Sequence, residues 1–154
     1  MLQFKGIRES FMHKIIIASD HGGFELKTRI FEHLKMKGYD ITDYGCYSPE
    51  SCDYPVFAKK VANEVSNNSE IKGILVCGTG IGMSITANKI IGIRAALCTD
   101  TFSARMTRMH NDSNVLCLGE RVTGTGLALD IVDTWLNTEF EGGRHQKRID
   151  MIEG

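Results

Sequence analysis

The sequence predicts an α/β fold, a three-layer α/β/α sandwich built on a five-stranded parallel sheet. Short apolar segments alternate along the chain with segments of helical periodicity. In the predicted strands nearly every residue is apolar, and not only every second one, as is typical of strands that helices cover on both faces. Right-handed crossovers between such strands place helices on both sides of the sheet, and the resulting arrangement is Rossmann-like.

The first half of the chain contains two predicted strands and two predicted helices. The β-branched run at residues 14–19 favours a strand. An amphipathic helix follows and ends near Gly38. Residues 39–44 predict a second, more polar strand, and residues 45–55 form a loop that holds both prolines. A helix is expected over Val56–Val65, because apolar side chains recur there at four-residue spacing.

The second half continues the same alternation. Asp100 or Thr101 is expected to cap the helix that they precede. The predicted elements are, in order, a strand at Gly73–Cys77, a helix that starts in Ser84–Lys89, a strand at Ile93–Leu97, a helix at Asp100–Met109, a strand at Asn114–Leu118 and a helix at Gly126–Asn137.

Length and charge limit the classes of protein that this chain can belong to. Its 154 residues suit one ordinary domain, which we place at residues 13–154. The net charge of -1 gives no field that recruits nucleic acid or an anionic membrane. Residues 1–12 carry charges throughout, so we expect a disordered extension and no secretory signal. No segment approaches the length of a membrane span.

The five cysteines indicate a reducing compartment. Their number is odd, three of them end apolar runs, and no Cys-x-x-Cys pair is present. A disulfide framework and a zinc knuckle are therefore not expected, and the predicted location is the cytoplasm.

A glycine-rich turn follows the third predicted strand. Gly78, Gly80 and Gly82 alternate there, so the backbone can turn sharply and present its N–H groups as an anion cradle. The spacing matches neither the dinucleotide fingerprint nor a Walker A loop. Cys77 stands at the lip of this turn. It is either an inert buried cysteine or a thiol that the helix N-terminus favours as a thiolate.

Polar residues also follow other predicted strands, at the edge where ligands bind in such folds. They include Asp20-His21, Thr99-Asp100 and Gly119-Glu120-Arg121. Asp20 can be a helix N-cap, or it can act with His21 on a substrate hydroxyl or phosphate.

His110-Asn111-Asp112 follows a crossover helix and precedes the fifth predicted strand. It is therefore expected at the opposite end of the sheet from Cys77. Either it forms an ordinary helix-ending turn, or it reaches the site of a partner subunit.

The C-terminal segment is basic. Arg144 and Arg148 share a face if the segment is helical, so they can clamp a phosphate or form a solvated cationic surface. They lie at the start of that helix, where the positive end of its macrodipole disfavours cations. A bound anion would remove that conflict.

Together these groups suit a phosphorylated small molecule whose reaction passes through an oxyanion. Proton abstraction beside a carbonyl needs a base and stabilisation of the enediolate, which backbone N–H donors supply. No spacing typical of metal ligands is present, so neither a metal nor a cofactor is expected.

Four motifs resemble the type B ribose-5-phosphate isomerases, a family that also holds galactose-6-phosphate isomerase subunits. They occur in family order and at family spacing from about residue 13 to the C-terminus. The motifs are Ser19-Asp20-His21-Gly22-Gly23, Cys77-Gly78-Thr79-Gly80-Ile81-Gly82, His110-Asn111-Asp112 and Gly142-Gly143-Arg144-His145-Gln146-Lys147-Arg148.

The resemblance implies a metal-free isomerase of the pentose phosphate pathway that interconverts ribose 5-phosphate and ribulose 5-phosphate through an enediol. Cys77 matches the base of the family, and Thr79 matches a residue that assists it. Some members instead use a glutamate at the place of Met83, so this chain falls in the cysteine branch.

The same resemblance implies the remaining roles. Asp20 and His110 match residues associated with opening the furanose ring. The loop of Gly78, Gly80, Ile81 and Gly82 matches the anion hole of the family. The residues that match its substrate and phosphate ligands are His21, Asn111, Arg121, Arg144 and Arg148.

The family is dimeric or tetrameric, with active sites shared between subunits, so a homo-oligomer is expected. The sugar stays open between ribose 5-phosphate and the 6-phosphates of allose or galactose. A non-catalytic sugar-phosphate-binding protein is a further alternative. The thiol of Cys77 favours the enzyme, because binding alone does not need it.

Overall fold

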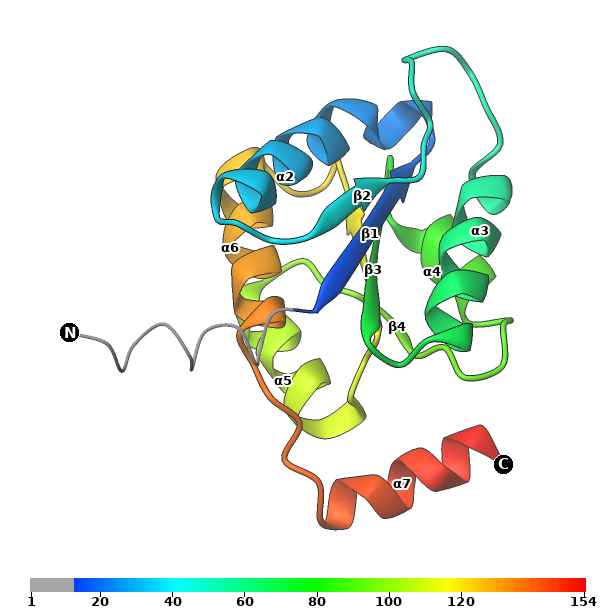
Figure 1. The fold of residues 1–154 in the computed structure, drawn as a ribbon, viewed down its shortest axis with the longest axis vertical. Helices are drawn as coiled ribbons and strands as arrows, with labels where there is room; N and C mark the ends of the chain where they lie inside the picture. Colours follow the sequence, from blue (N-terminus) through cyan, green and yellow to red (C-terminus); the bar gives the residue numbers. More distant parts are fainter. Residues whose placement is uncertain (1–12) are drawn as a thin grey trace, which may run out of the picture.

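The computed structural model describes residues 13–154, and the extension expected to be disordered, residues 1–12, lies outside the described residues. Five strands form one parallel sheet in the order β2-β1-β3-β5-β4 (Figure 1). The predicted three-layer fold is confirmed. The strands are β1 (Lys14–Ser19), β2 (Ile41–Asp43), β3 (Ile71–Cys77), β4 (Ala95–Leu97) and β5 (Val115–Gly119).

Helices cover both faces of this sheet. In Figure 1, α2 and α6 lie on one side of the strands and α3 and α4 on the other. The helical elements are η1 (His21–Gly23), α2 (Phe24–Met36), α3 (Tyr54–Asn67), α4 (Ile81–Ala87), α5 (Thr101–Asn111), α6 (Thr125–Leu136) and α7 (Arg144–Glu153).

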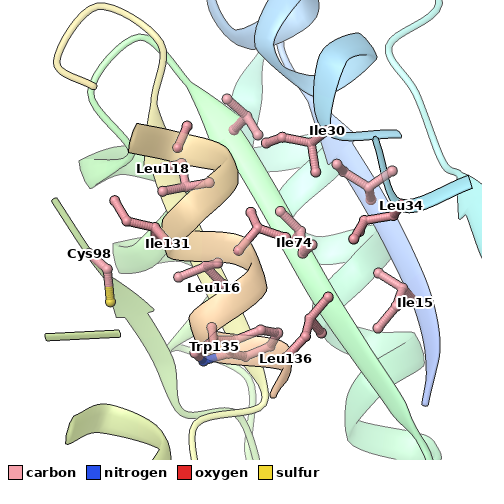
Figure 2. Close-up of a cluster of buried hydrophobic side chains, with 14 of the residues drawn as sticks. Ile15, Ile30, Leu34, Ile74, Cys98, Leu116, Leu118, Ile131, Trp135 and Leu136 are labelled. Atoms are coloured by element: carbon pink, nitrogen blue, oxygen red, sulfur yellow. The ribbon is translucent and has the colours of Figure 1, made fainter. Parts of the chain in front are cut away.

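Two apolar cores flank the sheet, because successive strand residues point to opposite faces. Ile15 and Ile74 pack with Trp135 of α6 in one core, as Figure 2 shows. Ile16 and Leu75 pack in the other core against α3 and α4. The burial of both faces accounts for strands that are apolar on nearly every residue.

Several predicted boundaries were wrong by a few residues. Helix α3 begins at Tyr54, so Pro55 lies in its first turn, where a missing N–H costs nothing, and not in the preceding loop. Helix α4 begins at Ile81 and ends at Ala87, earlier than the predicted start in Ser84–Lys89. Strands β2 and β4 are shorter than predicted, with three residues each.

Helix α7 stands apart from the sheet and packs on α5 (Figure 1). Gly142 and Gly143 precede it with φ of 70° and 57°, a conformation that glycine adopts without strain. Within residues 13–154, no helix combines the length and the apolar character that crossing a membrane requires.

All five cysteines are free thiols, in agreement with the expectation that no disulfide framework is present. Burial raises the pKa of Cys98 to about 11, and burial also raises the pKa of Cys117 above its usual range. These two thiols therefore act as small apolar core residues.

Candidate active site

Cys77 ends the central strand β3, and the glycine turn directs a backbone N–H at its sulfur. The N–H of Gly80 donates to Cys77 Sγ over 3.1 Å, and the side chain of Cys77 is 5% exposed. Gly80 has φ of 78°, and a Cβ there would lie 2.9 Å from the backbone carbon of Leu118. Glycine is therefore needed for this conformation, which holds the thiol and an amide together.

Thr79 sits at the exposed rim of the same turn. Its Oγ1 accepts a hydrogen bond from the N–H of Ile81 over 3.2 Å, at the first residue of α4. The hydroxyl thus satisfies one of the helix N–H groups that have no partner inside the helix.

The start of the loop after β5 packs directly on this turn. The N–H groups of Glu120 and Arg121 donate to the carbonyls of Cys77 and Gly78 over 2.9 and 3.0 Å. A Cβ on Gly78 would lie 3.6 Å from Cδ of Arg121, so the stem of this arginine crosses the turn. The strand-end rule brings Arg121 to Cys77 as predicted.

Asp20 and His21 approach from β1 on the other side. Asp20 is buried, and its Oδ1 accepts from the Gly23 N–H over 3.1 Å, which is the N-cap role weighed from the sequence. His21 is exposed, and its Nδ1 accepts from the Cys52 N–H over 3.2 Å. The neutral ring therefore carries its proton on Nε2, from which it can donate to an anion.

A cavity of about 540 Å³ opens beside His21, along α2. It does not reach Cys77, so it adjoins the strand-end edge without containing the thiol. It is lined by His21, Phe24, Glu25, Thr28, Arg29, Glu32, Pro49 and Glu120.

His110 and Asn111 lie at the opposite end of the sheet, as the topology predicted. They are the last two residues of α5, just before the amino end of β5. The carboxyl ends of β3 and β5 meet where Cys77 pairs with Gly119. The amino and carboxyl ends of β5 are four residues, or about 13 Å, apart. One chain therefore does not bring His110 to its own Cys77.

Arg144 and Arg148 are on α7, at this same far end. Arg144 is the first residue of the helix, after Gly143, which provides no side-chain cap. Both arginines are exposed, and their spacing places them on one face. Neither lies beside His21 or Arg121 within one chain.

His145 is a residue to which the sequence analysis gave no role. It is 6% exposed, and its ring stacks on that of His110 with centroids 4.2 Å apart and 15° between the planes. Nε2 of His145 pairs with Oε2 of Glu141 over 3.2 Å. The i,i+4 spacing of Glu141 and His145 is the feature of the sequence that could have indicated this pairing.

This cluster is also the one group of potential metal ligands found within residues 13–154. The ligand atoms of His110, Glu141 and His145 lie within 4.8 Å of one another. However, a histidine binds a metal in the plane of its ring, and no single ion can lie in both of two stacked, nearly parallel planes. The arrangement does not fit a metal centre.

Comparisons with known proteins agree with the motifs. A family model described as Ribose/Galactose Isomerase matches residues 15–152. The chain is 50% identical over 141 residues to ribose-5-phosphate isomerase B of Escherichia coli (strain K12), which covers 92% of this chain and 95% of that protein.

Solved structures show the same similarity. Ribose-5-phosphate isomerase B of Clostridium thermocellum is 57% identical with a TM-score of 0.89, over 91% of this chain and 95% of that one. Ribose-5-phosphate isomerase B from Mycoplasma genitalium, with bound ribulose-5-phosphate, is 46% identical with a TM-score of 0.89. That match covers 91% of this chain and 93% of the other.

Proposed function

The chain belongs to the ribose/galactose isomerase family, and from that premise we propose that it interconverts ribose 5-phosphate and ribulose 5-phosphate. The observation that carries this proposal is the Cys77 thiol, held by the Gly80 N–H at the strand-end edge. A structure of a relative contains bound ribulose-5-phosphate, which supports a five-carbon substrate here.

Cys77 acts as the base of this reaction. The thiolate removes the proton from C2 of the open-chain aldose and returns it to C1. The hydroxyl proton of O2 passes to O1, so the carbonyl moves from C1 to C2. The enediolate oxygens are held by backbone N–H groups of the loop made by Gly78, Gly80, Ile81 and Gly82, and Thr79 assists the transfer at its rim. Since the N–H groups of Gly80 and Ile81 already donate to Cys77 Sγ and Thr79 Oγ1, we assign this role first to the N–H groups of Gly78 and Gly82. Preorganised amides serve the role that a Lewis acid would otherwise serve, so the reaction proceeds without a metal.

The furanose ring of ribose 5-phosphate must open before C2 can lose its proton. Asp20 and His110 move the protons that this opening requires, and Asn111 binds a sugar hydroxyl. Since Cys77 and His110 lie at opposite ends of one sheet, the site is composed of two subunits. The phosphate is held by His21 and Arg121 of one subunit and by Arg144 and Arg148 of the other.

A homodimer is the simplest assembly with such shared sites. Exposed apolar side chains support it, because such side chains are often covered at interaction surfaces. Two of them lie on α4, which directly follows the glycine turn beside Cys77. The exposed residues of this part of the chain are Ile81, Ile85, Ile91, Leu97 and Phe102. The five free thiols favour a reducing compartment, and we place the enzyme in the cytoplasm.

A panel of aldose phosphates tests the proposed substrate. Purified protein is incubated with ribose 5-phosphate, allose 6-phosphate and galactose 6-phosphate, and ketose formation is followed for each. We expect the highest kcat/KM with ribose 5-phosphate. A higher value for either 6-phosphate would assign the enzyme to six-carbon sugars, and binding of all three without ketose formation would make it a binding protein.

A further inference from the structure

The imidazole of His110 is oriented by packing. None of the hydrogen bonds within residues 13–154 involves its ring, and its closest aromatic contact is the stacked ring of His145. Stacking fixes the plane of the His110 ring but leaves its in-plane nitrogens open to a ligand. The direction in which His110 can transfer a proton therefore depends on where His145 lies.

His145 is in turn held by Glu141. Burying a polar ring without a partner costs free energy, and the carboxylate of Glu141 supplies the partner for Nε2 at 3.2 Å. The backbone N–H of Glu141 donates to the carbonyl of Met109 over 3.1 Å. This hydrogen bond holds the backbone of Glu141 against the last turn of α5, at Met109, the residue before His110.

The end of α5 is fixed from its other side as well. Buried Arg108 donates through Nη1 to Oδ1 of Asp112 and to the carbonyl of Ser113, over 2.8 and 2.6 Å. Its Nε donates to the carbonyl of Thr138 over 3.3 Å. The chain on both sides of His110 is therefore held by hydrogen bonds, and the stacked ring of His145 is the aromatic contact that orients the His110 side chain.

We infer that His145, held by Glu141, is a positioning residue that orients the His110 imidazole for opening the furanose ring. This inference rests on the proposed function and adds two residues to it. His145 does not touch the reacting atoms. Its contribution is geometric, and misplacing a catalytic group by about 1 Å can cost about 100-fold in rate.

The two directions of the reaction separate ring opening from proton transfer. Ribose 5-phosphate is a furanose and needs both steps. Ribulose 5-phosphate is open-chain, because its C5 oxygen, which alone could close a five-membered ring on C2, carries the phosphate. Exchange of its C1 hydrogen with D₂O needs enediolate formation at Cys77 but no ring chemistry, and NMR measures it directly.

The test compares His145→Ala with the wild-type enzyme in both assays. We expect kcat for ribose 5-phosphate to fall about 10- to 100-fold, KM to stay within about threefold, and C1 exchange in ribulose 5-phosphate to stay within about twofold. Glu141→Ala should show the same pattern more weakly, and Glu141→Gln, which keeps an acceptor, should largely restore kcat. Gln146→Ala, an exposed neighbour on α7, is the matched control and should match the wild type.

Equal losses in both assays, or no loss in either, would overturn the positioning role. Glu141→Ala carries the same test if His145→Ala does not fold, because the Glu141 side chain is exposed. Failure of the proposed function looks different, since the wild-type protein would then neither convert ribose 5-phosphate nor exchange the C1 hydrogen.

Discussion

The N–H of Gly80 donates a hydrogen bond to Cys77 Sγ over 3.1 Å, and this contact joins the fold to the chemistry. It forms because Gly80 adopts a left-handed conformation directly after the central strand. The hydrogen bond fixes the position of Sγ against the glycine turn, and proton transfer needs a base that is held in place. In the proposed mechanism the glycine turn therefore positions the base as well as the enediolate.

Close packing of Gly119 against the turn gives a first prediction. A Cβ at this position would lie 2.5 Å from the backbone carbon of Thr79, so Gly119→Ala must displace the turn. We expect the free energy of unfolding to fall by about 1–3 kcal/mol and kcat to fall with it. Urea unfolding and steady-state kinetics measure both.

Gly126→Ala is the control for that substitution. Nothing lies within 4 Å of a Cβ there, and the position is inside α6. Alanine favours a helix over glycine, so this variant should gain up to about 1 kcal/mol. Equal stability changes in the two variants would contradict the packing argument.

Lys72 predicts a pH dependence of stability. It is buried on β3, with Nζ 5.5 Å from the centroid of the Trp135 ring, and burial followed by the charge of Arg108 lowers its pKa to about 8. The ordinary pKa of lysine, 10.5, applies in the unfolded chain. Between pH 8 and pH 10.5 the Lys72 side chain therefore keeps its proton in the unfolded chain and has released it in the folded chain. The lysine therefore destabilises the fold below pH 8, and the free energy of unfolding rises as pH increases through this window.

Lys72→Met should accordingly be more stable than the wild type at pH 7, by about 1–3 kcal/mol. The advantage should shrink between pH 8 and pH 10, as the wild-type lysine loses its charge. Chemical denaturation at several pH values measures the difference, and an advantage that grows with pH would contradict the assignment.

The proposed phosphate clamp predicts a KM effect. Arg144→Ala and Arg148→Ala should each raise KM for ribose 5-phosphate about tenfold or more and leave kcat within about threefold, because phosphate contacts hold substrate and transition state alike. Lys147→Ala is the matched control, since it removes an exposed cation from the same helix. If both arginine variants behave like Lys147→Ala, the arginines are only a solvated surface.

A site composed of two subunits predicts complementation. Cys77→Ala and His110→Ala proteins are each inactive alone, but a heterodimer places both lesions in one site and leaves the other intact. Random pairing makes half the dimers mixed, each with one good site of two, so about a quarter of the wild-type activity should return. If heterodimers form and no activity returns, each chain carries its own complete site.

The strands and their edge could be predicted because local pattern decides them. Strand β1 has the predicted bounds, since its β-branched run is set off by polar residues. The start of α4 was missed because Gly80-Ile81-Gly82 has a loop composition, and the helix begins there only through the positive φ of Gly80.

The site was predicted in part for the same reason. The rule for parallel strands brings Arg121 and His21 to the edge that holds Cys77, and sequence order places His110 at the other end. The part played by His145 depends on a turn at Gly142-Gly143 that folds the chain back on α5, and sequence spacing does not encode that contact.

Proton transfer by Cys77 is the central claim, and hydrogen exchange tests it most directly. Cys77→Ala should bind ribulose 5-phosphate and unfold at nearly the wild-type temperature. The rate at which its C1 hydrogen exchanges with D₂O should fall about 10²- to 10⁴-fold, the usual contribution of a general base. Exchange at the wild-type rate in this variant would contradict the account, because another group would then have to move the proton.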